Sequence, residues 1–118
     1  MQAEGAIQIT NENFEEEITK FPGVVLVDFW AVWCGPCIKM TPIIADLVKK
    51  YADNPNVRIA QLNVDEAQEA QEPFHVLSIP TFIVFANGQP VGSTIGAQPA
   101  APLVQLIEDA LKNLAPAK

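Results

Sequence analysis

The sequence predicts one α/β domain in which helices cover both faces of a mixed β-sheet. Segments with strand character alternate with segments whose apolar residues recur at helical spacing, a pattern typical of this fold class. The pair Asn87-Gly88 separates two strand-like segments, which predicts a β-hairpin and therefore an antiparallel part of the sheet. The 118 residues, 49% hydrophobic and 18% charged, suit a single globular core, so we expect one domain over residues 1–118.

The first third of the chain predicts a strand, a helix and a second strand. Ile7 to Thr10 has the pattern of a short strand, and Thr10 or Asn11 is placed to cap the helix that follows. Val24 to Ala31 is almost continuously apolar, as expected of a strand that is covered on both faces. The helix between these strands presents one apolar face, formed by Phe14, Ile18 and Phe21.

A long amphipathic helix is predicted next, from apolar residues that recur every three or four positions. Pro42 lies inside this helix. Because proline has no N–H group and clashes with the preceding turn, we expect a kink near Ile38. The apolar positions of the helix are Cys37, Met40, Ile44, Leu47, Val48 and Tyr51.

The second half of the chain supplies the rest of the sheet. Val57, Ile59 and Leu62 predict a third strand, and Asp65 is expected to cap a short helix that runs through Phe74. The two hairpin strands are expected over 81–85 and 91–95. A closing helix follows, and residues 115–118 are expected to fray. The apolar stripe of that helix is formed by Leu103, Leu106, Ile107, Ala110, Leu111 and Leu114.

Charge and hydropathy exclude two classes of partner. The net charge is −7, so the surface lacks the basic character that nucleic-acid binding requires. No apolar run approaches the roughly 20 residues of a membrane span, so we expect no membrane association. The segment Met1 to Gly5 has neither the basic start nor the apolar core of an export signal, and we expect a cytoplasmic location.

Cys34 and Cys37 are the only cysteines, and they lie three positions apart where a buried strand meets a helix. At a helix start the first N–H groups are unpaired and the dipole is positive, so a thiolate on Cys34 is stabilised. Gly35 leaves the approach open, and Pro36 suits the first helical turn, where its missing N–H has no cost. We therefore predict Cys34 as the attacking thiol and Cys37, expected to be less accessible, as the resolving thiol.

Two other interpretations of the cysteine pair remain open. The pair could form an inert disulfide, although so short a loop contributes little stability on chain-entropy grounds. It could also bind a metal, but structural zinc takes four ligands and the chain offers only these cysteines and His75. We expect His75 to be a surface residue at the end of the short helix. No metal site is expected in one chain, while a cluster shared between two chains stays open.

Asp28 stands in the middle of the apolar run Val24 to Ala31, where an unpaired carboxylate is costly. Burial is expected to raise its pKa, so that it exchanges a proton near neutral pH, and the strand carries it toward the cysteine loop. Our hypothesis is that Asp28, directly or through a water molecule, takes the proton from Cys37 as that sulfur attacks. The alternative is a carboxylate that backbone groups satisfy at a sheet edge.

Several motifs resemble the thioredoxin family, in the order and spacing of that family, from about Ile7 to Leu114. The most specific is the five-residue motif Trp33-Cys34-Gly35-Pro36-Cys37, together with the buried acid and Pro80. The other matching segments are Asp28-Phe29-Trp30-Ala31, Pro42, Asp65, Ile79-Pro80-Thr81, Asn87-Gly88 and Ile95-Gly96-Ala97.

The resemblance implies a thioredoxin fold, a mixed five-stranded sheet flanked by four helices, with Pro80 in cis and facing the cysteine pair. It also implies protein-disulfide reduction by a monomer that binds no cofactor itself and receives electrons from NADPH through a flavoprotein, thioredoxin reductase. Extended substrate segments would bind in a shallow apolar groove, although ordinary packing explains each apolar member equally well. The matching groove residues are Trp33, Ile79, Pro80, Ile95, Gly96 and Ala97.

Four positions depart from the family pattern. Gln61 stands where many bacterial relatives carry a lysine near the buried acid, so we expect the pKa of that acid to be higher than in those relatives. Val32 and Ile38 replace charged residues that are common beside the motif, which makes the rim around the first cysteine more apolar. Ser78 replaces a common glycine and is expected to narrow the groove slightly.

Two alternative functions share this fold. A disulfide oxidase or isomerase would stabilise its thiolate more strongly, usually with a histidine between the cysteines, and Gly35-Pro36 offers none. A non-redox binding subunit would use only the surface, and it would not need a buried acid beneath a reactive thiol. The sequence therefore favours a disulfide reductase.

Overall fold

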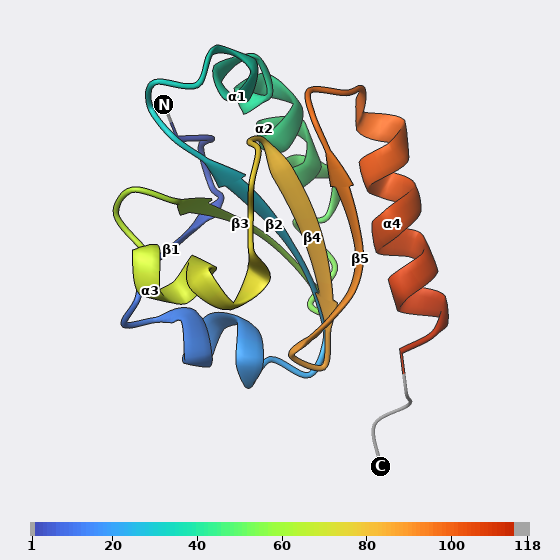
Figure 1. Ribbon diagram of the computed structural model, residues 1–118. Helices are drawn as coiled ribbons and strands as arrows, with labels where there is room; N and C mark the ends of the chain where they lie inside the picture. Colours follow the sequence, from blue (N-terminus) through green and yellow to red (C-terminus); the bar gives the residue numbers. More distant parts are fainter. Residues whose placement is uncertain (1, 115–118) are drawn as a thin grey trace.

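The computed structural model describes residues 2–114, which form one five-stranded sheet between two layers of helices (Figure 1). The strand order is β1-β3-β2-β4-β5; the first three of these strands are parallel, and β4 pairs antiparallel with β2 and β5. The mixed sheet and its four helical segments are confirmed, with two of the segments divided. The fraying expected of residues 115–118 lies outside the described residues. The elements are β1 (Ile7–Ile9), η1 (Glu15–Thr19), β2 (Val24–Trp30), α1 (Gly35–Lys39), α2 (Thr41–Lys50), β3 (Val57–Asn63), α3 (Gln68–Gln71), η2 (Glu72–Phe74), β4 (Thr81–Ala86), β5 (Gln89–Ile95) and α4 (Ala100–Lys112).

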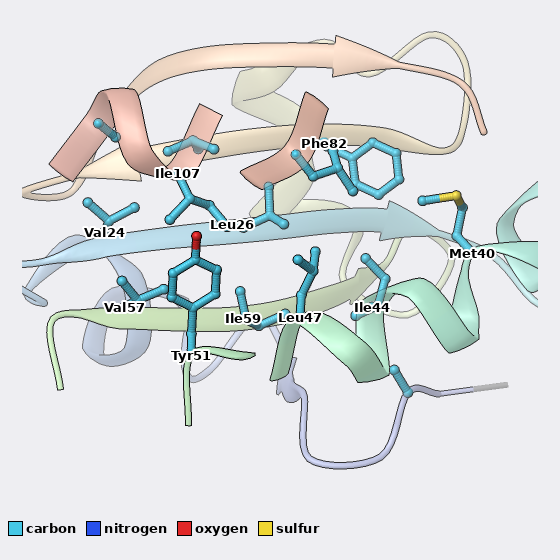
Figure 2. Close-up of a cluster of buried hydrophobic side chains, with 14 residues drawn as sticks. Val24, Leu26, Met40, Ile44, Leu47, Tyr51, Val57, Ile59, Phe82 and Ile107 are labelled. Carbon is cyan, nitrogen blue, oxygen red and sulfur yellow. The ribbon is translucent and has the colours of Figure 1, made fainter. Parts of the chain in front are cut away.

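β2 is the central strand and is buried along its whole length, because helices cover both faces of the sheet. Its side chains alternate between the two faces. Val24 and Leu26 join the core beneath α2 and α4 (Figure 2). Val25 and Val27 join the core of the opposite face, beneath η1 and the segment around α3. Even-numbered positions of β2 therefore face α2 and α4, and Asp28 is one of them.

The long helix predicted after the cysteines is divided into α1 and α2 at Met40, two residues beyond the kink expected at Ile38. Pro42 explains the division, because it has no N–H group to donate to the Ile38 carbonyl. The chain tightens there instead: the Met40 N–H donates to the carbonyl of Cys37 at 3.0 Å and also to that of Ile38. Regular bonding restarts from the Ile44 N–H to the Met40 carbonyl at 2.9 Å.

Thr10 caps the turn that leads into η1, although η1 itself begins at Glu15 and has no side-chain cap; the later short helix is not capped. The Thr10 hydroxyl accepts from the Asn13 N–H at 3.0 Å, and the Asn13 side-chain oxygen accepts from the Thr10 N–H at 2.7 Å. α3 begins only at Gln68 and has no side-chain cap. The prediction that Asp65 caps it is wrong, because no N–H group at the start of this helix donates to the Asp65 carboxylate. The Asp65 carboxylate binds an indole N–H instead.

β4 and β5 form the predicted hairpin, and both strands are longer than expected. Asn87 and Gly88 at its tip have φ values of 52° and 79°, as a type I′ turn requires. The tip packs against the end of η1: the Asn87 N–H donates to the Gly23 carbonyl at 3.1 Å, and a Cβ on Gly88 would collide with the Thr19 carbonyl. The turn therefore needs glycine both for its backbone conformation and for its packing.

Gly88→Ala is expected to lower the free energy of unfolding by about 3 kcal/mol, because backbone strain adds to the collision with the main chain. Gly96→Ala is a matched control. Its φ of 96° is also strained, but a Cβ there meets no atom within 4 Å, so we expect a loss of only about 1 kcal/mol. Urea unfolding of the two variants measures the difference; equal losses would remove the collision from the explanation.

Candidate functional site

The two cysteines lie where β2 leads into α1, and they are joined by a disulfide. Cys34 is the N-cap of α1, and the Cys37 N–H donates to its Sγ at 3.2 Å. This N–H is placed to donate to a thiolate on Cys34 in the reduced protein; the stabilisation of that thiolate stays a prediction. Because α1 has only five residues, we expect the local N–H group to contribute to that stabilisation alongside a short helix dipole.

Both cysteines are buried in the oxidised protein. Cys34 is 5% exposed and Cys37 is 3% exposed, so the predicted difference in access has the expected sign but is small. Gly35 and Pro36 between them are exposed, and a Cβ on Gly35 would meet no atom within 4 Å. The surface over Gly35 and Pro36, next to the buried sulfur atoms, is therefore open to a partner.

The segment Ile79-Pro80 lies against the cysteine pair, and its peptide bond is cis, as the resemblance implies. The Sγ of Cys34 is 3.7 Å from the Ile79 carbonyl oxygen, and the Ile79 side chain packs on the cluster that holds both cysteines. The Gly96 N–H donates to the Pro80 carbonyl at 2.8 Å, which ties the end of β5 to the same place. The fold thus brings Ile79, Pro80 and Gly96 together beside the disulfide.

Exposed apolar side chains gather around this site. In the described part of the chain, Val32 and Trp33 are exposed between β2 and α1, Ile38 is exposed on α1, Leu77 is exposed between η2 and β4, and Ile95 is exposed at the end of β5. Apolar surface of this kind is typical of binding sites. A pocket of about 600 Å³ adjoins Trp33 but is not lined by Ile95, Gly96 or Ala97, so the concave surface extends toward α3. Its lining is Trp33, Val64, Asp65, Gln68, Gln71, Glu72, Val76, Leu77, Ser78 and Ile79.

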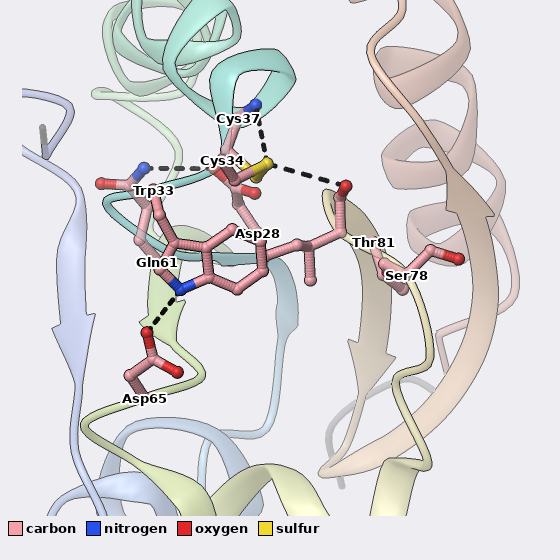
Figure 3. The surroundings of a disulfide bond; sticks show 9 residues. Asp28, Trp33, Cys34, Cys37, Gln61, Asp65, Ser78 and Thr81 are labelled. Atoms are coloured by element: carbon pink, nitrogen blue, oxygen red, sulfur yellow. Dashed lines mark hydrogen bonds between the residues drawn. A yellow bond between two sulfur atoms is a disulfide. The ribbon is translucent and has the colours of Figure 1, made fainter.

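Asp65 holds the motif tryptophan in place. Trp33 is 67% exposed, and its Nε1–H donates to the Asp65 carboxylate at 2.8 Å (Figure 3). The Asp65 N–H in turn donates to the Asn63 side-chain oxygen at 2.9 Å. A charge-assisted bond of this length orients a side chain that packing alone leaves free. Asp65 is therefore part of the site rather than a helix cap.

Asp28 is fully buried on the central strand, between Gln61 of β3 and Phe82 of β4. The sheet-edge alternative is therefore wrong. The Gln61 Nε2 donates to Asp28 Oδ2 at 3.1 Å (Figure 3), and Oδ1 receives no hydrogen bond from residues 2–114. Burial raises the pKa of Asp28 from 3.8 to about 7, while the bond from Gln61 lowers it. Trp30, two residues further along the same face of β2, belongs to the buried cluster that holds both cysteines.

Gln98 belongs to the site, although no sequence pattern points to it. Its backbone N–H donates to the Met40 Sδ at 3.4 Å, and its Nε2 donates to the Gly96 carbonyl at 2.8 Å. Gln98 thus links the loop after β5 to the helix break behind Cys37. The contact joins residues 58 positions apart, which explains why local patterns do not reveal it.

Among residues 2–114, no group of three or more His, Cys, Asp or Glu side chains is arranged to hold a metal ion. No helix of the same range has the length and apolar character to cross a membrane. His75 is exposed at the end of η2, where its φ of 50° is left-handed; its predicted surface position is confirmed.

Comparison with known proteins gives one consistent family. The family model for thioredoxin matches residues 5–109. A thioredoxin of Staphylococcus saprophyticus is 43% identical over 102 residues, which are 86% of this chain and 94% of that protein. A thioredoxin of Alicyclobacillus acidocaldarius is 43% identical over 88% of this chain and 96% of its own length. A thioredoxin of Mycobacterium tuberculosis is 38% identical over 92% of this chain and 91% of its own length.

Proposed function

Because the chain belongs to the thioredoxin family, we propose that it reduces disulfides of partner proteins with electrons that a flavoprotein reductase delivers from NADPH. The chain is a thiol-disulfide oxidoreductase, and Cys34 and Cys37 are its redox-active pair. One observation supports the separate roles of the residues. Cys34 caps the start of α1 and accepts a hydrogen bond from the Cys37 N–H, and both cysteines cluster with Trp30, on the face of β2 that carries the buried Asp28.

The cycle begins with the reduced pair. The Cys34 thiolate attacks a disulfide of the substrate, so that one substrate sulfur leaves as a thiolate and the other forms a mixed disulfide with Cys34. Cys37 then attacks the Cys34 sulfur, which breaks the mixed disulfide and releases the second substrate thiolate. The substrate has gained two electrons, and the protein holds the disulfide seen in the structure. The reductase restores the dithiol.

Asp28 is proposed to accept the proton that Cys37 loses as it attacks. A carboxyl group with a pKa of about 7 exchanges protons readily at neutral pH, and an ordinary exposed carboxyl group does not. The Oδ1 atom, which has no donor among residues 2–114, is free to receive the proton. This role requires Asp28 to be ionised when the mixed disulfide forms.

Substrate segments are proposed to bind over the exposed apolar residues beside the disulfide. Trp33, Ile95 and Ala97 are exposed, and the Gly96 N–H holds the end of β5 to the Pro80 carbonyl. The absence of a β-carbon at Gly35 leaves space beside the sulfur pair, and Pro36, with its fixed φ, lies in the first turn of α1. We further propose that residues 1–118 act as one cytoplasmic, monomeric domain that binds no cofactor.

The decisive experiment is insulin disulfide reduction, driven first by dithiothreitol and then by NADPH with a thioredoxin reductase. We expect activity in both assays, measured in the second as NADPH consumption. Activity with dithiothreitol alone would reject the proposed electron source. Equilibration with reduced and oxidised glutathione separates a reductant from an oxidase or isomerase: a pair that glutathione readily reduces would favour the second class.

A further inference from the structure

A buried chain of hydrogen bonds joins the N-terminal segment to Asp28. The parallel register sets Gln61 of β3 beside Gln8 of β1 and beside Asp28 of β2. Gln61 Oε1 accepts from the Ala3 N–H at 2.8 Å and from the Gln8 Nε2 at 3.1 Å, while its own Nε2 donates to Asp28 Oδ2 at 3.1 Å. Ala3 and Gln61 are 3% and 2% exposed, so water cannot readily replace the bond from Ala3 to Gln61 or the bond from Gln61 to Asp28. The bond from Gln8 is partly buried.

The Gln61 amide has one favourable orientation in this chain. An amide presents an acceptor at one end and two donors at the other, and the network around it decides which way it points. Figure 3 shows the Gln61 nitrogen toward Asp28 and the oxygen pointing away. The Gln8 Nε2 also donates to the Ala6 carbonyl at 3.3 Å, which holds the Gln8 amide as a donor. Rotating the Gln61 amide by half a turn would therefore set its donors against the donors of Ala3 and Gln8, and its oxygen against the Asp28 carboxyl group. The N-terminal segment therefore selects the orientation in which Gln61 donates to Asp28.

We propose that Ala3 and Gln8 are positioning residues for Asp28, because their N–H groups hold the Gln61 amide as a donor to the carboxyl group that receives the Cys37 proton. A donor fixed on a carboxylate favours its ionised form. The segment thereby keeps Asp28 able to accept a proton at neutral pH. Only the transfer of the Cys37 proton to Asp28 rests on the proposed function; the hydrogen bonds that join Ala3, Gln8, Gln61 and Asp28 do not depend on it.

In the described part of the chain, no charged side chain is placed to stabilise the Asp28 carboxylate instead of the Gln61 amide. On the face of the sheet that holds Asp28, α2, β4 and α4 present apolar side chains to the core, and α1 presents Cys37. Tyr51 is titratable, but its hydroxyl group donates to the Glu108 carboxylate. Figure 2 shows Tyr51 and Met40 toward opposite ends of the buried cluster beneath α2 and α4. The charged residues of the covering helices lie on their exposed or half-exposed surfaces: Lys39, Asp46, Lys49, Lys50, Glu108, Asp109 and Lys112.

Carboxyl NMR titration of Asp28 in the oxidised, full-length protein tests this proposal. Gln61→Met removes the donor, and we expect it to raise the pKa of Asp28 by about one unit. Gln8→Met and Ala3→Pro each remove one of the two N–H groups, and each should raise it by about half as much. Ala3→Gly keeps the N–H group and should change nothing. In a Gln61→Met background, Gln8→Met should have no further effect, because it acts through the amide.

An unchanged Asp28 pKa in Gln8→Met would overturn the proposal. So would a Gln8→Met shift of the Asp28 pKa that is equally large in the wild-type and Gln61→Met backgrounds. Gln8→Met decides the question even if Ala3→Pro does not fold. The release of a mixed disulfide, followed at pH 7 and at pH 9, should slow only at the lower pH in the variants that shift Asp28. Insulin reduction by the wild type is measured in parallel: its absence would reject the proposed function, whereas the titration would still decide the amide orientation.

Discussion

Replacing Cys34 with serine is expected to reduce insulin disulfide reduction by roughly a thousandfold or more, to the background rate of dithiothreitol alone. A hydroxyl group does not ionise at neutral pH, so the N–H of Cys37 has no thiolate to stabilise and no nucleophile reaches the substrate. The rate of insulin reduction under dithiothreitol measures this effect. A Cys34→Ser protein that retained a substantial part of the activity would show that Cys37 is the attacking sulfur.

Cys37→Ser is the matched comparison, because it preserves the nucleophile and removes only the resolving thiol. We expect this variant to accumulate a covalent complex with its substrate through Cys34, visible by non-reducing electrophoresis and lost on reduction. Cys34→Ser should form no such complex. The opposite pattern, with a trapped complex only in Cys34→Ser, would reverse the assigned roles.

The parts of the fold that sequence could predict are those fixed by local physical constraints. The unbroken apolar run of β2 predicts a strand covered on both faces, and the Asn87-Gly88 pair predicts the hairpin, because few residues tolerate positive φ at both positions. The place of the cysteine pair is also predictable from local sequence, because the apolar run of β2 comes before it and the proline of the first helical turn lies within it. These features depend on neighbours in the chain.

The errors arise where contacts between distant segments decide the outcome. A carboxylate before a helix is a good cap in isolation, but Asp65 lies within reach of the Trp33 indole, 32 positions away, and bonds to it. The Gln61 network depends on the register of three strands, which no local pattern specifies.

Asp28→Asn is expected to stabilise the oxidised protein by about 4 kcal/mol at pH 8.5. Burial raises the pKa of Asp28 from 3.8 to about 7, so the folded protein holds a proton that the unfolded chain releases between these values. Stability is therefore fully present below the lower pKa, and it falls as pH rises toward the upper one. A rise of about three units at 1.4 kcal/mol per unit gives the expected magnitude. Asparagine carries no charge at any pH and does not incur this loss.

Urea unfolding of the oxidised wild type and variant at pH 4 and pH 8.5 measures the effect, because the disulfide keeps both cysteines from titrating. The gain from asparagine should be large at pH 8.5 and nearly absent at pH 4. Asp46→Asn, at an exposed position of α2, is the control and should change stability by less than about 0.5 kcal/mol at either pH. A gain of the same size at both pH values would mean that asparagine improves packing rather than removing a buried charge. The proton-accepting role of Asp28 would then lose its physical basis.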